Sequence, residues 1–322
     1  MSAELRSNGS PFPSLDTSRA TLPDVALDGR PRASGRLDRV GMTGIETVVR
    51  LPGDPAPFQL PARVDAFVDL DDPRAKGIHM SRMVLALERA LSGGELTPRL
   101  LEGLLRQLRS DQGSLSRSAE VHIRTSHPIT RTSLLSAIAG RRIYPFSWSG
   151  RLDPGDSVRL ALGTTITYSS TCPCAQALSR DALLASFWSR FRDLDEIPIA
   201  EALDWIGEDG LLPVPHSQRS SAEVGVQIDP QADPLAPREL IDLVEEALGT
   251  PVQAVVKRVD EQEFARRSGA RPLFCEDAAR EVAAALAADP RITAHRVRVE
   301  HRESLHPHDA VAEVSSPDWV WT

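Results

Sequence analysis

The sequence predicts an α+β fold built from two tandem ββααββ modules, with antiparallel sheets backed by helices. Two observations support this prediction. Strand-like and helix-like segments in the first half of the chain follow the order strand, strand, helix, helix, strand, strand. The second half repeats that order, which indicates two antiparallel sheets, each backed by a pair of helices. The predicted modules span residues 37–150 and 151–322.

The composition indicates a soluble protein of a reducing compartment. Of the 322 residues, 41% are hydrophobic and 25% are charged, as in typical globular proteins. No apolar segment reaches the roughly 18 residues needed to cross a bilayer, and the N-terminus lacks the apolar core of a signal peptide. Three cysteines are too few for a disulfide framework. We therefore expect a cytoplasmic protein without a membrane partner.

The net charge of −8 argues against binding to nucleic acid, because nucleic-acid-binding proteins present a basic face. It is compatible with a small anionic ligand held by a few local arginines or lysines. Residues 1–36 mix Ser, Pro, Gly, Arg and Asp without sustained periodicity. We expect them to form a disordered tail.

The elements of the first module follow from apolar periodicity and from capping residues. Val-rich, partly alternating segments predict strands, and apolar residues at helical spacing predict helices. Gly93 and Gly94 end the first helix, while Thr97 caps the second and Pro98 occupies its first position. In chain order, the predicted elements are strands 38–51 and 61–71, helices 77–94 and 97–113, and strands 119–127 and 129–149.

The second module repeats this order with one interruption. Its predicted elements are strands 157–171 and 221–228, helices 237–249 and 275–290, and strands 294–303 and 309–315. Within residues 180–215, Leu184, Phe187, Trp188 and Phe191 stand at i, i+3, i+4 and i+7, which predicts a helical hairpin inserted between the first two strands. The hairpin has two interpretations: a packed decoration of the fold, or a lid or subunit contact.

Residues able to carry chemistry occur at predicted element ends and in loops, where reactive groups are usually presented. Cys172 and Cys174 flank a proline at the end of a long strand, a spacing that does not fit a CxxC zinc knuckle. The other segments are HSQR (216–219), DEQE (260–263), FCED (274–277) and ESLHPH (303–308). Cysteine, histidine and glutamate together suit zinc or another first-row metal, with a position left for water. Each segment alone also fits an ordinary surface or packing role, and spacing does not decide between these interpretations.

Taken together, these segments resemble the GTP cyclohydrolase IB family. The segments that carry the resemblance occur in the family's order and are KGIHMSR (76–82), SSTCPCAQALS (169–179), HSQRS (216–220), VVKRVDEQ (255–262), FCED (274–277) and ESLHPHDA (303–310). The resemblance runs from about residue 39 to residue 314. It implies the tunnelling fold, whose ββααββ modules assemble through their sheets into barrels, and a homotetramer with active sites near subunit interfaces.

The resemblance implies a hydrolase of cyclic amidine C–N bonds. Such an enzyme converts GTP and water to 7,8-dihydroneopterin triphosphate and formate, the first step of tetrahydrofolate and pterin synthesis. The resemblance also implies one divalent metal ion per active site, which would be zinc, manganese or iron. A bound divalent ion can lower the pKa of water from about 15.7 to about 7 and so provide hydroxide at neutral pH. Hydroxide can then add to C8 of the purine.

The resemblance assigns metal binding to Cys172, Glu261, His306 and His216, with His216 acting either as a ligand or as a proton-transfer group. It assigns catalytic roles to Cys172, His216 and Glu276. Glu276 matches the glutamate expected to anchor the guanine edge. A carboxylate there selects guanine, because adenine lacks the matching donors and would leave the carboxylate desolvated and unpaired.

The triphosphate requires cations, and those in matching segments include Arg219, Lys257 and Arg82. The chain also departs from the family pattern: the hairpin separates Cys172 from the HSQR segment, Ser217 replaces an asparagine, and Gln262 replaces a lysine. These departures leave two alternatives open. One is a related cyclohydrolase that yields a cyclic-phosphate pterin, and the other is a non-catalytic metal-binding paralogue with the same fold.

Overall fold

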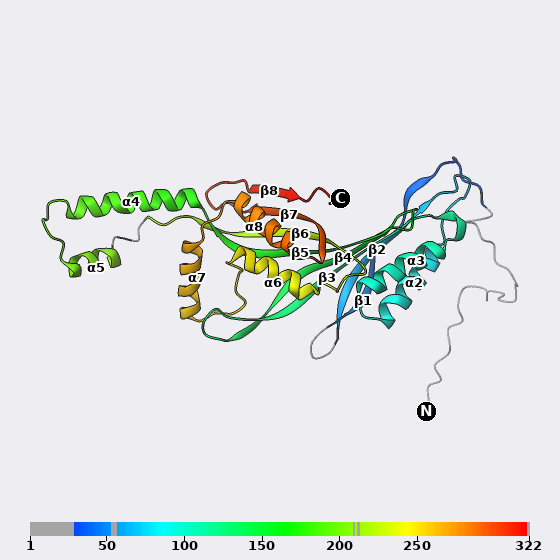
Figure 1. The fold of residues 1–322 in the computed structure, drawn as a ribbon, viewed down its shortest axis with the longest axis horizontal. Helices are drawn as coiled ribbons and strands as arrows, with labels where there is room; N and C mark the ends of the chain where they lie inside the picture. The colour runs from blue at the N-terminus through cyan, green and yellow to red at the C-terminus, as the bar shows by residue number, and fades with distance from the viewer. Residues whose placement is uncertain (1–28, 53–56, 209, 211–212, 321–322) are drawn as a thin grey trace, which may run out of the picture.

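A continuous antiparallel sheet forms the centre of the computed structural model, which describes residues 29–52, 57–208, 210 and 213–320. In these residues the sheet has eight strands, which lie side by side in chain order (Figure 1). The strands are β1 (Leu37–Leu51), β2 (Phe58–Leu70), β3 (Ala119–Thr132), β4 (Ala139–Leu152), β5 (Val158–Thr171), β6 (Ser217–Ile228), β7 (Ile292–His301) and β8 (Ala310–Ser315).

The two predicted modules share this sheet instead of forming two separate sheets. β4 pairs with β5 from Phe146 opposite Thr164 to Leu152 opposite Val158. The connection at residues 153–157 is a short turn, and strands joined by a short turn pair antiparallel as a hairpin. The two halves are therefore bonded edge to edge, which element order alone does not reveal.

Four helices cover one face of the sheet (Figure 1). They are α2 (Met80–Gly93), α3 (Pro98–Ser110), α6 (Pro237–Leu248) and α8 (Cys275–Ala288). Leu101 and Leu105 of α3 are fully buried against the sheet, as are Val244 of α6 and Val282 of α8. Each such side chain contributes about 1.5–3 kcal/mol through burial. As predicted, Thr97 caps α3, accepting a hydrogen bond from the backbone N–H of Leu100 at 3.2 Å.

β3 and β4 are divided differently from the prediction, which placed one strand over 129–149. β3 continues through Pro128 to Thr132, and β4 starts only at Ala139. Proline is tolerated there because the pairing of β2 with β3 ends at Ala62 opposite Thr125. The edge beyond that point needs no N–H donor from β3.

α7 (Arg258–Ala270) was not predicted as a helix. Its faces are polar and Asp260 is its one buried residue, so it lacks the apolar stripe that periodicity detects. Asp260 holds the start of α7 against the β3–β4 turn by accepting the backbone N–H groups of Leu135 and Ser136 at 2.8 and 2.9 Å.

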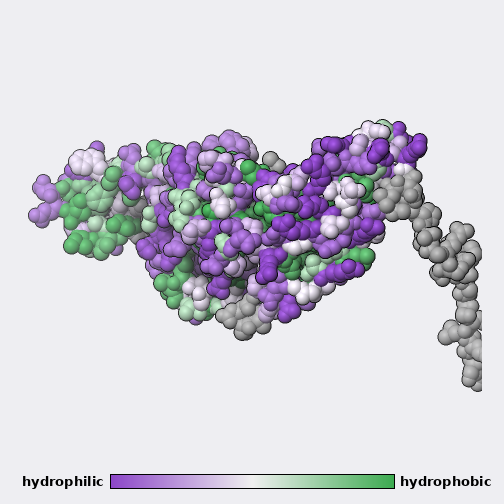
Figure 2. All heavy atoms as spheres, turned by 45° about the vertical axis from the view of Figure 1, so that its right-hand side comes forward, coloured by the Kyte–Doolittle hydropathy of each residue, from purple (hydrophilic) through white to green (hydrophobic). Residues whose placement is uncertain are grey.

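Two further helices, α4 (Pro173–Phe191) and α5 (Ile199–Glu208), lie between β5 and β6, and α4 begins earlier than residue 180. They project from one end of the molecule (Figure 1), and Figure 2 shows hydrophobic residues gathered at that end. Most of the predicted tail, residues 1–28, lies outside the described residues, and residues 29–36 contain neither helix nor strand. Within the described part of the chain, every helix is too short or too polar to span a lipid bilayer.

Candidate active site

Cys172 lies at the junction between β5 and α4. It is the N-cap residue of α4, and its Sγ accepts a hydrogen bond from the backbone N–H of Ala175 at 3.5 Å. Pro173 occupies the first helical position, where its missing N–H costs nothing. The free N–H groups at a helix start favour negative charge, so a thiolate is well placed here. Cys172 is half-buried, whereas Cys174 is exposed on the first turn of the helix.

His216 is brought next to Cys172 although two helices separate them in sequence. The backbone N–H of Cys172 donates to the carbonyl of His216 at 3.2 Å, and the neighbouring Thr171 and Ser217 hydroxyls are 2.8 Å apart. The ends of β5 and β6 therefore stay paired, and the hairpin loops out from them.

The imidazole of His216 is oriented by two side chains. Its Nδ1 lies 3.0 Å from Gln218 Oε1 and 3.7 Å from Glu303 Oε2. Donation of the Nδ1 proton to Gln218 Oε1 leaves Nε2 with its lone pair, and this tautomer is assigned from that hydrogen bond. A histidine that binds a metal usually donates its other ring N–H to such an acceptor. His216 thus has the surroundings of a metal ligand.

His306 belongs to the loop between β7 and β8, three residues after Glu303. Its ring stacks on His308, with the centroids 4.9 Å apart and the planes at 7°, and both histidines are exposed. The loop reaches the Cys172 end of the sheet because Glu303 contacts His216. The structure does not show the His306 ring at that contact.

Glu261 stands on the first turn of α7 and is exposed. The other end of α7 meets α4, where the Gln176 side-chain amide donates to the carbonyl of Gly269 at 2.6 Å. Gly269 is eight positions after Glu261 on the helix, a distance of about 12 Å along the axis. Glu261 therefore lies toward the end of α7 away from its contact with α4.

The donor chemistry of these residues fits a divalent ion, but one chain does not assemble the whole set. Among the described residues, no group of three or more His, Cys, Asp or Glu side chains lies close enough to share a metal. Cys172 and His216 are neighbours through the β5–β6 end, while Glu261 and His306 lie on separate segments. The four-ligand set stays a prediction.

Glu276 lies at the same end of the sheet as Cys172. The segment before α8 is tied to β5 by the backbone N–H of Leu273, which donates to Thr171 at 3.2 Å. Glu276 is exposed on the first turn of α8. Its own backbone N–H and the Cys275 thiol, 3.2 Å from Oε2, hydrogen-bond the carboxylate and lower its pKa. The carboxylate is ionised at neutral pH and can accept two N–H donors from a ligand.

A buried pair of side chains lies beneath Glu276. The Tyr168 hydroxyl is 2.7 Å from His301 Nε2, and neither side chain is more than 3% exposed. Burial lowers the pKa of His301 to about 4. Burial also raises the pKa of the adjacent Cys275 to about 11. Both groups are therefore neutral under ordinary conditions, and Glu276 is the charged group of this cluster.

Arg219 lines a cavity of about 480 Å³ with two further arginines, Arg142 and Arg302. The cavity opens where β4 and β5 separate beyond Phe146. Thr167 shares the lining, and its carbonyl accepts from the Arg142 guanidinium at 3.4 Å. Arg142 is paired with Glu245 and Arg302 with Glu300, whereas Arg219 has no carboxylate partner among the described residues. Arg219 is therefore the guanidinium of this cavity best placed to bind a phosphate group, because arginine binds phosphate oxygens through paired N–H donors.

The other two predicted cations are placed differently. Lys257 is exposed and directly precedes α7. Arg82 is exposed on α2, and its guanidinium donates to the carbonyl of Asp111 at 2.9 Å. α2 packs against β1, which lies at the opposite end of the strand order from β6 and β7. One chain does not bring Arg82 to the Cys172 region.

Sequence reasoning missed the residues that support the predicted ones. Gln218 was detectable, because residues two apart on a strand share a face and Gln218 follows His216 by two. Glu303 is the first residue of the ESLHPH segment, and Arg302 directly precedes it. Arg142 carried no local signal, because its place in the cavity depends on the separation of β4 from β5.

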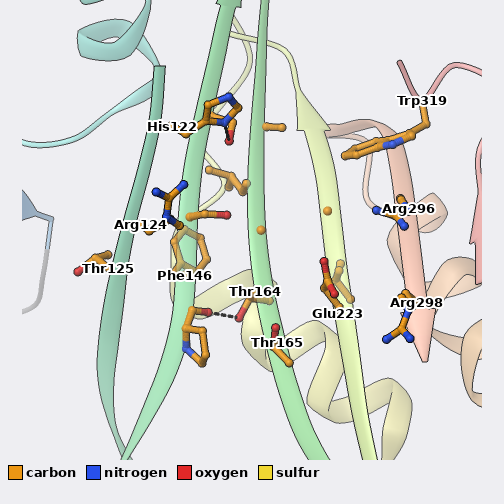
Figure 3. Close-up of a pocket in the computed structure, with 18 residues that line it drawn as sticks. His122, Arg124, Thr125, Phe146, Thr164, Thr165, Glu223, Arg296, Arg298 and Trp319 are labelled. Atoms are coloured by element: carbon orange, nitrogen blue, oxygen red, sulfur yellow. Dashed lines mark hydrogen bonds between the residues drawn. The ribbon is translucent and has the colours of Figure 1, made fainter. Parts of the chain in front are cut away.

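A second cavity of about 430 Å³ lies on the sheet (Figure 3). Its labelled ionisable residues are His122, Arg124, Glu223, Arg296 and Arg298. The arginines have carboxylate partners, as in the 2.7 Å contact of Arg124 with Asp65. None of the predicted site residues is among the described residues that line it.

Comparison with known proteins places this geometry in context. The family model described as type I GTP cyclohydrolase folE2 matches residues 22–312. The GTP cyclohydrolase FolE2 of Hydrogenovibrio crunogenus (strain DSM 25203 / XCL-2) is 40% identical over 295 residues, covering 91% of this chain and 94% of the relative. That of Pseudomonas putida (strain GB-1) is 40% identical over 301 residues, covering 93% and 96%.

A solved structure supports the predicted fold. A highly active mutant of Bacillus sp. TB-90 urate oxidase aligns with a TM-score of 0.50 at 8% identity, covering 86% of this chain and 99% of that chain. At this identity the likeness concerns the fold alone. The fold is the tunnelling fold, as predicted.

Proposed function

Because the chain belongs to the type I GTP cyclohydrolase FolE2 family, we propose that it converts GTP and water to 7,8-dihydroneopterin triphosphate and formate. This is the first step of tetrahydrofolate and pterin synthesis. The observation that supports it most strongly is the identity to two relatives of that name over nearly their whole length. The site adds the chemistry that the reaction needs.

Guanine recognition is assigned to Glu276. Its ionised carboxylate offers two oxygens to the N1–H and the exocyclic amine of guanine. Adenine presents no such pair of donors, so its binding would leave the carboxylate desolvated without compensation. The Cys275 thiol holds one carboxylate oxygen in place at 3.2 Å, which limits the rotamers that Glu276 must lose on binding.

The triphosphate is assigned to the cavity lined by Arg142, Arg219 and Arg302. Arg219 lies near the start of β6, three residues after His216, which directly precedes the strand, so a ligand held there extends toward the Cys172 end of the sheet. Lys257 precedes α7 on the exposed surface and is a further candidate. Arg82 would have to come from another copy of the chain.

One divalent ion, zinc, manganese or iron, is assigned to Cys172, His216, Glu261 and His306, where it would lower the pKa of water and supply hydroxide for attack on C8. The chain's own residues prepare this centre. Gln218 accepts the Nδ1 proton of His216 and so keeps Nε2 available, and the Glu303 carboxylate lies 3.7 Å from the same nitrogen. The start of α4 supports negative charge on the Cys172 sulfur.

We further propose a cytoplasmic homotetramer with active sites near the subunit interfaces. Support comes from the incomplete ligand set: among the described residues, Glu261 and His306 are not grouped with Cys172. The site would close when copies assemble. The low cysteine content agrees with a reducing compartment.

The activity is tested by incubating metal-loaded protein with GTP and measuring formate and a fluorescent pterin after oxidation. We expect both products with at least one of zinc, manganese and iron. Cys172→Ala and Glu276→Ala should abolish them, while Cys174→Ala, a matched change on the exposed side of the same turn, should retain them. A wild type inactive with all three metals would instead indicate the non-catalytic paralogue, and a cyclic-phosphate product the related cyclohydrolase.

A further inference from the structure

Behind His216, three buried polar side chains are joined by hydrogen bonds. They are Gln218, Ser170 and Ser220, which are 8%, 2% and 1% exposed, and we call them the polar row. We propose that Ser170 and Ser220 are positioning residues, which hold the Gln218 amide in the orientation that keeps the His216 proton on Nδ1 and leaves Nε2 free for a metal ion. The inference rests on the proposed metal centre and adds to it two residues outside the predicted ligand set.

The contacts run without a break from the imidazole to the second serine. Gln218 Oε1 lies 3.0 Å from His216 Nδ1, and Gln218 Nε2 donates to Ser170 Oγ at 3.0 Å. The Oγ atoms of Ser170 and Ser220 are 2.7 Å apart. Within the described part of the chain, every buried side-chain oxygen and nitrogen atom of the polar row has a partner. Both ends of the Gln218 amide are therefore held.

Strand pairing places the polar row at the end of the sheet where the site lies. Ser170 of β5 is opposite Gln218 of β6, and Gln218 and Ser220, two residues apart on β6, share its buried face. The next two residues on that face, Ala222 and Val224, are apolar and at most 1% exposed. Burying a hydroxyl or an amide costs free energy unless it is hydrogen-bonded. A hydrogen-bonded polar row on an otherwise apolar face indicates a role beyond packing.

The orientation of the Gln218 amide decides which nitrogen of neutral His216 carries the proton. The amide oxygen accepts hydrogen bonds and the amide nitrogen donates them. With Oε1 toward Nδ1, the imidazole donates from Nδ1 and Nε2 keeps its lone pair. With the amide turned over, its NH2 group would face Nδ1, and the proton would lie on Nε2. A histidine binds a metal only through an unprotonated nitrogen, so this second orientation would oppose metal binding.

The two serines favour the first of these orientations. A serine hydroxyl carries one proton. When Ser170 gives its proton to Ser220, only its lone pairs face the amide, so it accepts from the Gln218 NH2 group and cannot donate to the Gln218 oxygen. This direction of the hydroxyl protons is assigned from the hydrogen-bond pattern. Without the Ser170 hydroxyl, that end of the amide has no hydrogen-bond partner among the described residues, and both orientations become accessible.

The test measures the zinc affinity of the full-length protein by competition with a chromophoric chelator, a readout that does not require turnover. Ser170→Val and Ser170→Thr introduce side chains of the same shape that differ in the hydroxyl. Ser170→Val should weaken zinc binding about tenfold, the lower end of the loss for residues that orient metal ligands, while Ser170→Thr should stay within about twofold of the wild type. Ser220→Ala should also weaken binding. Wild-type affinity in Ser170→Val or in Ser220→Ala would refute the proposal.

A double-mutant cycle separates amide orientation from packing. The carboxylate introduced by Gln218→Glu accepts hydrogen bonds and has no donor, so it holds the proton on Nδ1 without help from Ser170. In the Gln218→Glu background, Ser170→Val should therefore change zinc affinity by less than about twofold. The same loss in both backgrounds would show a packing effect and refute the proposal. If Gln218→Glu does not fold, the comparison of Ser170→Val with Ser170→Thr decides alone.

Thr164→Val is the matched control. Thr164 is another buried residue of β5, 4% exposed, and its hydroxyl donates to the Pro145 carbonyl at 3.0 Å. The substitution removes one buried hydroxyl from the same strand and should leave zinc affinity unchanged. An equal loss in Thr164→Val would indicate a general effect on β5 and overturn the inference, as would a wild type that does not bind zinc. The assay with GTP reports separately whether the proposed function stands.

Discussion

A buried carboxylate, Glu245, offers a quantitative test of how α6 is attached to the sheet. Glu245 is 9% exposed. Its Oε1 accepts the Tyr144 hydroxyl at 2.7 Å and the Arg142 guanidinium, and its Oε2 lies 3.0 Å from Arg131 Nη2. The side chains of Arg131 and Arg142 are only 18% and 12% exposed. One carboxylate thus serves two largely buried cations.

Glu245→Ala should lower the free energy of unfolding by about 3 kcal/mol, the lower end of the cost of breaking a buried ion pair. The lower end applies because Arg131 keeps Asp242 as a partner, while Arg142 loses its carboxylate. Urea unfolding at pH 7, followed by circular dichroism at one protein concentration, measures the change.

Glu246→Ala is the matched control, since Glu246 is the adjacent residue of α6 and is exposed. It should change stability by less than about 0.5 kcal/mol. Glu245→Gln should fall between the two, because it keeps an acceptor for Tyr144 but loses the charge. A loss below about 1 kcal/mol in Glu245→Ala would show that the network adds no net stability, and the reasoning would be refuted.

Three further predictions concern the site and the sheet. Burial lowers the pKa of His301 from 6.5 to about 4, so the unfolded chain takes up the proton first as the pH falls. The stability that neutral His301 contributes is therefore complete above about pH 6.5 and is lost toward pH 4, by up to about 3 kcal/mol. Urea titrations at both pH values should show that His301→Gln removes this part of the pH dependence, and an unchanged slope would contradict it. Gly225→Leu should detach the C-terminal segment, because even a Cβ at residue 225 would lie 2.8 Å from the Trp319 ring. The fluorescence of Trp319 should then shift to the red, and an unshifted spectrum would show that the ring does not pack on Gly225. Cys275→Ala should raise the KM for GTP severalfold with little change in kcat, because the thiol positions Glu276 without touching the reacting atoms. Cys275→Ser should bring the KM most of the way back to the wild-type value. An equal rise in KM in both variants would indicate a packing role for Cys275.

Local sequence signals predicted the elements that are specified by a capping residue or by an apolar stripe. The cap at Thr97 and the apolar stripe of α3 were sufficient to place that helix, and both are present in the structure. α7 was missed because its attachment depends on Asp260, one buried carboxylate that binds a distant turn. No periodicity in α7 reports that contact.

The site residues show the same difference between what local sequence signals predict and what contacts between distant segments decide. Short segments identified Cys172, His216 and Glu276, and the structure places all three at one end of the sheet through hydrogen bonds at the ends of β5 and β6 and before α8. Of the two residues that contact His216, Gln218 lies in the same segment, whereas Glu303 comes from the loop between β7 and β8. The contact with Glu303 depends on the pairing of β6 with β7, which no single segment contains.

The sequence by itself determined the fold family, the alternation of strands and helices, and the residue types available for chemistry, because these depend on side-chain periodicity and on segments a few residues long. Only the tertiary structure decided that the two halves share one sheet, that Arg142 joins Arg219 in a cavity, and that the hairpin leaves apolar residues exposed. These features arise from hydrogen bonds and packing between residues far apart in the chain, whose free energy depends on how the whole sheet closes.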